Sequence, residues 1–297
     1  MGRERVGFIG LGNMGKPMAG SLLSKGFALV AHDAMAERTA ILAQRGATPA
    51  ASIAEVVAAS DIVVTMLPNT PDVEVVFAEM MRSGRKGQMH VDMSTIDPLA
   101  SRRFAAALAG KGIGWVDAGV GRSPAHAERG ESLFMVGGTP ADLARAQPLL
   151  DAMGNKVIQC GGPGAGITMK IVLNFLSMAT CQLTAEALTL GGKLGLEART
   201  MYEVITNSLA NNDHLKNYWP GKVLAGDIEP GFAIDLAYKD LSIAVSTANG
   251  AGVPVFTGAA ARECLSQARN AQGLGGKDIT AVLVAAATNA GTRPPRL

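Results

Sequence analysis

The feature that most constrains the fold is a glycine turn near the start of the chain. A short apolar strand over 6–9 leads directly into residues 10–15, which read G-x-G-x-x-G. An amphipathic stretch over 16–25 follows, and a second apolar run over 27–31 ends close to Asp33. This order of strand, turn, helix, strand and acid has the length that a dinucleotide-binding βαβ unit requires.

Each glycine of the turn has a physical role. Gly10 permits the tight turn, Gly12 lets the backbone approach a pyrophosphate, and Gly15 lets the helix pack closely on the strand. N–H groups at the helix start then face the phosphates. We therefore expect the whole turn to bind the cofactor: Gly10, Leu11, Gly12, Asn13, Met14 and Gly15.

Asp33 indicates which dinucleotide binds. A carboxylate at the end of the second strand accepts hydrogen bonds from the adenosine ribose hydroxyls and repels a 2′-phosphate. No arginine follows it at once, since Arg38 comes only after four other residues. We expect NAD, with NADP less favoured. The alternative is that Asp33 merely caps the next helix.

Composition excludes several classes of protein. The chain has 297 residues and a formal charge of +2 with interspersed signs, so it has no basic stripe for nucleic acid or an anionic membrane. The first apolar run is too short for a signal peptide or a membrane span. Three widely spaced cysteines fit neither a disulfide framework nor a zinc site, and no metal site is expected. We expect a cytoplasmic protein.

Beyond the first βαβ unit, apolar segments alternate with helical patterns. Further strands are expected over 61–67, 88–93, 114–118, 133–138 and 156–159. Such alternation is typical of a mostly parallel, doubly wound sheet with helices on both faces. We predict an α/β fold in which an NAD-binding Rossmann domain occupies residues 1–161.

After a glycine-rich turn at 161–166 the alternation stops and the remaining pattern is helical. A long apolar stretch over 167–190 predicts a helix buried between two layers. Shorter helices are expected around 201–208, 236–249, 258–271 and 278–288. We therefore predict an all-α domain over 162–297 for substrate binding and oligomerisation, beginning with the long interdomain helix.

Residues that follow the expected strands are candidates for a ligand cleft. Ligands on a doubly wound sheet bind beyond the carboxyl ends of its strands. That rule selects Pro68, Asn69, Ser94, Thr95 and the segment after Asp117. We expect Leu67 and Pro68 to contact the cofactor.

A polar stripe lies on the long apolar helix. Lys170, Asn174 and Ser177 are spaced i, i+4 and i+7, so they share one helix face. Polar groups on a buried helix are costly unless they are satisfied or used. The alternative is that Lys170 extends to solvent and Asn174 ties helices together.

Four ordered motifs resemble the β-hydroxyacid dehydrogenases, a family that includes 3-hydroxyisobutyrate dehydrogenase. The motifs are the glycine turn with Pro17-Met18-Ala19, the segment Asp92-Met93-Ser94-Thr95, the segment from Asp117 to Gly138, and Gly164-Ala165-Gly166 followed by Lys170 and Asn174. Tyr238-Lys239-Asp240-Leu241 is similar to the lysine-aspartate segment that lies near the cofactor in this family. The resemblance covers nearly the whole chain.

The resemblance implies a catalytic site between a Rossmann domain and an all-α domain, with Lys170 as general acid/base. In reduction, a lysine ammonium would stabilise the charge on the carbonyl oxygen and supply the proton. Asn174 would orient Lys170 or bind the substrate oxygen. Ser94, Thr95 and Lys239 are expected around the nicotinamide and substrate. A homodimer or homotetramer is also implied.

The segment Val120-Gly121-Arg122-Ser123 resembles that of the 3-sulfolactaldehyde reductases within the family. Arg122 would supply a fixed fork for a sulfonate or carboxylate. Gly121, Ser123 and Ser177 would complete that pocket. Leu173 departs from the pattern, since these reductases typically carry an asparagine there, and the change favours a less demanding anion. The alternative is that Arg122 is a solvated loop residue.

The expected activity is NAD(H)-dependent interconversion of a small anionic 3-hydroxyacid, or hydroxysulfonate, with its semialdehyde. One rival is an imine reductase of the same fold, but such enzymes typically replace the lysine. A second rival is a non-catalytic dinucleotide-binding module for oligomerisation or regulation. The presence of both Lys170 and Asn174 argues against it.

Overall fold

A computed structural model describes residues 4–297 of the chain. It divides into two compact units, Met1–Lys170 and Ile171–Leu297, so the division falls inside a long helix. The predicted domain boundary lies a few residues earlier, at 161/162, in the turn that precedes this helix, and it stays a prediction.

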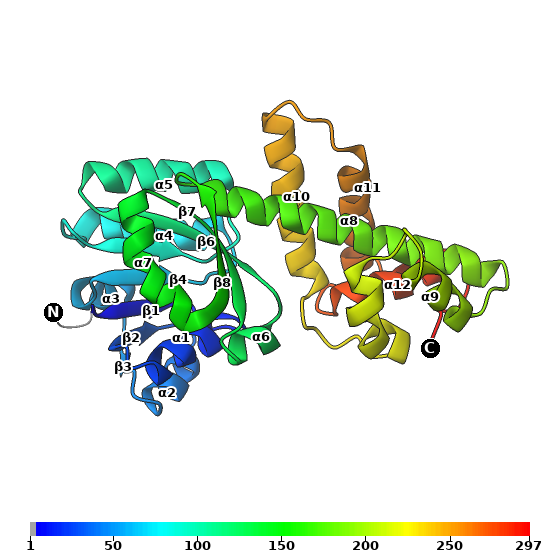
Figure 1. Ribbon diagram of the computed structural model, residues 1–297, viewed down its shortest axis with the longest axis horizontal. Coiled ribbons are helices and arrows are strands. Elements are labelled where there is room, and N and C mark those ends of the chain that lie inside the picture. The colour runs from blue at the N-terminus through cyan, green and yellow to red at the C-terminus, as the bar shows by residue number, and fades with distance from the viewer. Residues whose placement is uncertain (1–3) are drawn as a thin grey trace. The chain divides into compact units, whose positions relative to one another are not determined.

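The first unit is built on one eight-stranded sheet with the order β3-β2-β1-β4-β5-β6-β7-β8 (Figure 1). The strands are β1 (Val6–Ile9), β2 (Leu29–His32), β3 (Thr48–Pro49), β4 (Ile62–Thr65), β5 (Met89–Asp92), β6 (Gly114–Gly121), β7 (Ser132–Gly138) and β8 (Gly154–Gly161). All neighbours pair parallel except β6 and β7, which are antiparallel. The predicted Rossmann-type sheet is confirmed. Strand β3 was missed because its two residues show no apolar run.

Helices cover both faces of this sheet. They are α1 (Gly15–Ser24), α2 (Ala36–Ala43), α3 (Ile53–Ala59), α4 (Thr70–Ser83), α5 (Pro98–Gly110), α6 (Pro124–Glu128) and α7 (Pro140–Met153). Adjacent residues of one strand enter different cores: Val63 of β4 packs in one apolar cluster and Val64 in the other. Because side chains alternate across a strand, both faces are buried, as a parallel sheet requires.

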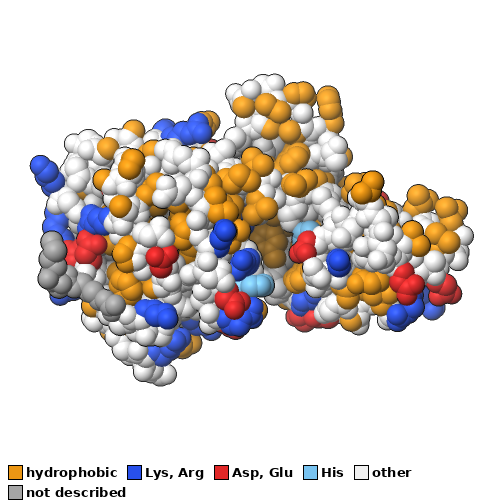
Figure 2. All heavy atoms as spheres, in the orientation of Figure 1, with side chains coloured by type: hydrophobic (Ala, Val, Ile, Leu, Met, Phe, Trp, Pro, Cys, Tyr) orange, Lys and Arg blue, Asp and Glu red, His pale blue; other side chains and the backbone are white. Residues whose placement is uncertain are grey.

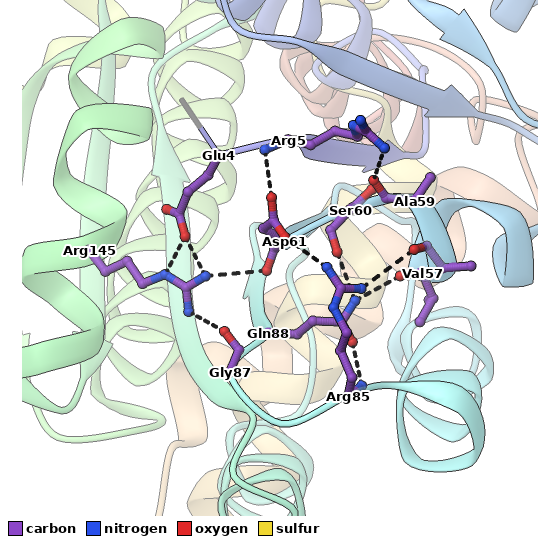
Figure 3. Close-up of polar contacts among 11 residues, drawn as sticks. Glu4, Arg5, Val57, Ala59, Ser60, Asp61, Arg85, Gly87, Gln88 and Arg145 are labelled. Atoms are coloured by element: carbon purple, nitrogen blue, oxygen red, sulfur yellow. Dashed lines mark hydrogen bonds and ion pairs between the residues drawn. The ribbon is translucent and has the colours of Figure 1, made fainter. Parts of the chain in front are cut away.

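A polar network closes the amino ends of the strands (Figure 3). Arg145 Nε and Nη2 donate to Glu4 Oε1 at 2.8 and 2.5 Å. Arg85 Nη2 donates to Asp61 Oδ1 at 2.7 Å, and a hydrogen bond from the Arg5 backbone N–H, followed by Arg85, holds the pKa of Asp61 below its usual range. Gln88 Nε2 donates to two backbone carbonyls. These contacts hold together the end of the sheet opposite to the predicted cleft residues.

The second unit is helical, as predicted. It contains most of α8 (Ala165–Lys193), then α9 (Ala198–Thr206), the short π- and 3-10 segments η1 (His214–Tyr218), η2 (Trp219–Gly221) and η3 (Val223–Ala225), followed by α10 (Ile234–Gly250), α11 (Phe256–Asn270), η4 (Ile279–Ala281) and α12 (Val282–Asn289). Its core surrounds the fully buried Trp219. The short segments between α9 and α10 were not foreseen.

Helix α8 is long and apolar enough to cross a membrane by length and composition, a test that core helices of soluble proteins also pass. The expectation that it is buried between two layers is wrong for one face. Val172, Leu176, Leu183 and Leu190 are 54%, 65%, 61% and 62% exposed. Figure 2 shows hydrophobic side chains on the surface of the helical unit.

Candidate cofactor and active site

The glycine turn between β1 and α1 is shaped by close backbone contacts. Gly10 has φ +96, and a Cβ added there would lie 2.3 Å from the Met66 carbonyl oxygen. A Cβ on Gly15 would lie 1.9 Å from the carbonyl oxygen of Gly10. A Cβ on Gly12 would meet only Arg38 Nη1, at 4.0 Å. Two glycines are therefore required by the fold, while Gly12 leaves open space at the turn.

The start of α1 suits a phosphate group. Its N-cap residue, Met14, makes no capping hydrogen bond through its side chain, and the first turn carries no acid. Asn13 is exposed, Met14 is half-buried and Leu11 is buried. N–H groups of such a helix start attract phosphate oxygens, so the residues present fit the pyrophosphate of a dinucleotide.

Asp33 lies against this turn. Its Oδ2 accepts a 2.6 Å hydrogen bond from Leu11 N, and its Oδ1 accepts one of 2.8 Å from Met35 N. Arg38 Nη1 is 3.5 Å from Oδ1. A carboxylate has about four acceptor sites, so Asp33 can still accept bonds from ribose hydroxyls. Asp33 is not the N-cap of α2, which is Met35, although its bond to Met35 N also ties it to the start of that helix.

A buried hydrogen-bonded network lies at the carboxyl ends of β4 and β5. Thr65 Oγ1 donates to Asp92 Oδ1 at 2.7 Å and contacts His90 Nε2 at 2.9 Å. Asp92 Oδ1 also accepts from Ser94 N at 3.1 Å, and Ser94 Oγ accepts from Leu67 N at 2.9 Å. Ser94 therefore fixes the loop that carries Leu67, and it is only 1% exposed.

Burial shifts the two titratable groups of this network in opposite senses. It raises the pKa of Asp92 to about 6, against hydrogen bonds from Ser94 and Thr65. It lowers the pKa of His90 to about 3, so the imidazole is neutral. Of the predicted residues nearby, Thr95 is half-buried and Pro68 is exposed. Sequence reasoning gave Asp92 only as part of a motif and missed its role as an anchor.

Lys170 lies close to β6 because the facing residue on that strand is a glycine. A Cβ on Gly119 would lie 2.7 Å from the Cβ of Lys170 and 3.3 Å from the Gly166 carbonyl oxygen. Asp117 fixes the start of the same helix: its two oxygens accept from Gly164 N at 2.6 Å and Ile167 N at 2.8 Å. Gly119 therefore lets the helix approach the strand at Lys170.

The segment after β6 places Arg122 at its surface. Arg122 has φ 71, in the left-handed region, which is strained for a residue with a side chain. Its Nη1 donates to the Glu131 carbonyl oxygen at 2.6 Å and to Asn155 Oδ1 at 2.9 Å. Ser123 Oγ lies 2.9 Å from His126 Nδ1, and Gly121 is buried.

The rest of the polar stripe is satisfied within the helical unit. Asn174 Nδ2 donates to Asp240 Oδ2 at 2.6 Å, and Lys239 Nζ lies 2.7 Å from Asp240 Oδ1. Ser177 Oγ lies 2.7 Å from Nε2 of His214, whose pKa is lowered by burial. Sequence reasoning missed His214 and gave Asp240 no role. No spacing rule links these residues to α8.

No group of three metal-binding side chains occurs among residues 4–297. Two hollows of about 530 and 630 Å³ lie at the amino ends of the strands, lined in part by Glu4 and Arg145 and by Arg5 and Glu55. Neither contains a predicted site residue.

Two family models match the chain. The NAD binding domain of 6-phosphogluconate dehydrogenase matches residues 5–162, and the NAD-binding domain of NADP-dependent 3-hydroxyisobutyrate dehydrogenase matches residues 164–286. Each match covers one of the two kinds of structure seen here, the sheet and the helices.

Similar whole proteins are also known. The 3-sulfolactaldehyde reductase of Escherichia coli is 42% identical over 96% of this chain and 97% of its own. The 2-(hydroxymethyl)glutarate dehydrogenase of Eubacterium barkeri is 38% identical over 94% of this chain and 93% of its own. The Mycobacterium tuberculosis 3-hydroxyisobutyrate dehydrogenase structure has a TM-score of 0.88 at 29% identity, and the match covers 95% of this chain and 99% of that one. The chain belongs to the β-hydroxyacid dehydrogenase family and is an NAD-dependent oxidoreductase.

Proposed function

We propose that the protein reduces a small anionic semialdehyde to the corresponding 3-hydroxyacid or hydroxysulfonate, with Lys170 as general acid. The observation that carries this proposal is the contact of Lys170 with β6 at Gly119, which fixes the lysine backbone on the sheet that also holds the glycine turn. The names of the similar proteins support the substrate class.

Bound NADH supplies a hydride to the carbonyl carbon. The ammonium of Lys170 stabilises the negative charge that develops on the carbonyl oxygen and donates the proton that completes the alcohol. Asn174 orients Lys170 or accepts from the substrate hydroxyl. Thr95 and Lys239 contribute to the surroundings of the nicotinamide, together with Leu67 and Pro68, and Ser94 holds their loop.

Arg122 is proposed to bind the anionic head group, with Gly121, Ser123 and Ser177. A guanidinium has five N–H donors, and both of the hydrogen bonds described above come from Nη1. The strained backbone at Arg122 supports a functional reason for its position. Leu173, half-buried beside Asn174, offers no hydrogen bond to a sulfonate oxygen, so carboxylate semialdehydes remain candidates beside sulfolactaldehyde.

The test is NADH oxidation with sulfolactaldehyde, succinic semialdehyde, tartronate semialdehyde and methylmalonate semialdehyde. With an aldehyde that turns over, Lys170→Ala should lower kcat by roughly 10²-fold or more, as for loss of a general acid, while NADH still binds. Lys156→Ala, at an exposed position of β8, is the matched control. If NADH binds but the wild type reduces none of these four aldehydes, the proposed substrate class is wrong.

Assembly into a homodimer or homotetramer is proposed as well. The exposed leucines of α8 recur at seven-residue intervals, at 176, 183 and 190, and form an apolar stripe. Light scattering of the wild type and of Leu183→Glu tests this, since the variant should lower the molar mass. A cytoplasmic location is proposed from the three free thiols.

A further inference from the structure

Asp240 connects two residues of the proposed active site. It lies on α10 and is 3% exposed. Its Oδ2 accepts the 2.6 Å hydrogen bond from Asn174 Nδ2, and its Oδ1 lies 2.7 Å from Lys239 Nζ. A buried carboxylate is costly unless it is paired. Here each oxygen is paired with a different predicted site residue.

This pairing determines which end of the Asn174 amide faces away from Asp240. An asparagine side chain can present either its carbonyl oxygen or its NH₂ group to a neighbour, and the two ends have nearly the same shape. An ionised carboxylate only accepts hydrogen bonds. The NH₂ group must therefore face Asp240, and the Asn174 Oδ1 acceptor lies at the other end of the amide.

The Oδ1 end of the Asn174 amide matters because of Lys170. Lys170 precedes Asn174 by four residues on α8, so the two side chains lie on one face of the helix. An ammonium only donates hydrogen bonds, so it is stabilised by an oxygen and repelled by a second NH₂ group. We propose that Asp240 is a positioning residue that keeps the Asn174 oxygen available to Lys170 or to the substrate hydroxyl. The inference rests on the proposed role of Lys170.

The Asp240 carboxylate also pairs with Lys239. Its contact with Lys239 and its contact with Asn174 can be tested separately. Lys239→Gln removes the ion pair but leaves the Asn174–Asp240 hydrogen bond intact. Asp240→Asn removes both, and it also lets the amide at 174 turn, because an amide at 240 can donate or accept. The proposal therefore expects a larger loss of kcat in Asp240→Asn than in Lys239→Gln.

The decisive variant exchanges the two side chains. In Asn174→Asp/Asp240→Asn, the amide at 240 donates to the carboxylate at 174, whose other oxygen is again an acceptor. Asp240→Asn should lower kcat by roughly 10²-fold, the scale for a misplaced catalytic group, and the exchange should recover at least tenfold of it. NADH affinity, measured by fluorescence titration, should fall no further in these two variants than in Lys239→Gln, because all three lose the same ion pair.

The pH profile of kcat provides a readout that a purely structural tie would not move. Aldehyde reduction needs a protonated lysine, so kcat falls as pH rises through the pKa of the acid. The exchange brings a negative charge closer to position 170, so the alkaline limb should move to higher pH. In Asp240→Asn it should move to lower pH.

Three outcomes would overturn the inference. These are unchanged kcat in Asp240→Asn, an exchange variant that regains its melting temperature but not kcat, and unmoved alkaline limbs. If the wild type reduces no aldehyde, the proposed function fails instead.

Should Asp240→Asn not fold, the wild type still allows a test. The Asn174 side-chain amide, assigned by its loss in Asn174→Asp, should show one strongly downfield N–H proton in NMR spectra of asparagine-labelled protein. Two ordinary amide protons would reject the bond to a carboxylate.

Discussion

The glycine turn of the first unit and the polar stripe of α8 are built in different ways. The turn works through its backbone: two of its glycines lie where a Cβ would collide with a carbonyl oxygen. The stripe works through side chains whose partners lie 66 and 37 residues away in the sequence. A local backbone requirement leaves a pattern in the sequence, whereas a pair of distant side chains does not.

The largest effect should come from adding atoms to the turn. Gly15→Val would place a Cβ 1.9 Å from the Gly10 carbonyl oxygen, and backbone atoms cannot move aside as a side chain can. Overpacking of this kind costs about 3 kcal/mol of folding stability, so the melting temperature should fall, and the displaced turn should bind NADH more weakly. NADH titration should show this loss.

Gly110→Val is the matched control for this substitution. It lies at the end of α5, and nothing is within 4 Å of its added Cβ. Wild-type NADH affinity in Gly15→Val would show that the turn tolerates a side chain, and the contrast between the two regions would fail.

The network at Asp92 is an exception to the contrast between a backbone-built first unit and a side-chain-built stripe, because it consists of side chains within the first unit. Burial raises the pKa of Asp92 from 3.8 to about 6. The folded state then binds the proton more tightly than the unfolded state, so this group lowers stability as pH rises from about 4 to 6. This loss of stability amounts to about 2 kcal/mol between pH 4 and pH 6, and Asp92→Asn should abolish it.

Urea unfolding at pH 4.5 and pH 7.5 measures the slope. The exposed Glu74→Gln on α4 should leave it at the wild-type value. A variant with the same slope as the wild type would mean that Asp92 is ionised at both pH values.

The sequence predicted the contacts of the first unit more fully than those of the second, and the reasons are physical. The strand-turn-helix pattern and Asp33 are adjacent in sequence, and Asp33 does contact the turn at Leu11 N. Ser94 was selected by the carboxyl-end rule, but its bond to Leu67 N depends on the neighbouring positions of β4 and β5. The partners of Asn174 and Ser177 depend on how helices pack, which helix periodicity does not determine. The strain at Arg122 likewise leaves no sequence signal.

The choice between NAD and NADP tests the comparison between backbone and side-chain contributions, since it depends on one side chain, Asp33, beside the glycine turn. Asp33→Ala removes the carboxylate that repels a 2′-phosphate, while Arg38, now 3.5 Å from Asp33, remains to attract it. The ratio of NADPH to NADH affinity should rise about tenfold, or about 1.4 kcal/mol.

The double variant Asp33→Ala/Arg38→Ala separates the two causes. It should lose most of the gain in NADPH affinity if Arg38 binds the phosphate. An unchanged preference in Asp33→Ala itself would show that Asp33 does not select the cofactor.

The smallest expected effect concerns the stripe of α8. Ser177 is proposed to bind the anionic head group, and His214 orients its hydroxyl at 2.7 Å. Loss of one hydrogen bond is worth about 1 kcal/mol, so Ser177→Ala should raise the KM for the aldehyde about fivefold with kcat unchanged. Ser208→Ala, exposed just after α9, is the control. A change in kcat without a change in KM would instead place Ser177 with Asn174, in the group that acts on Lys170, and would extend the catalytic part of the stripe by one helical turn.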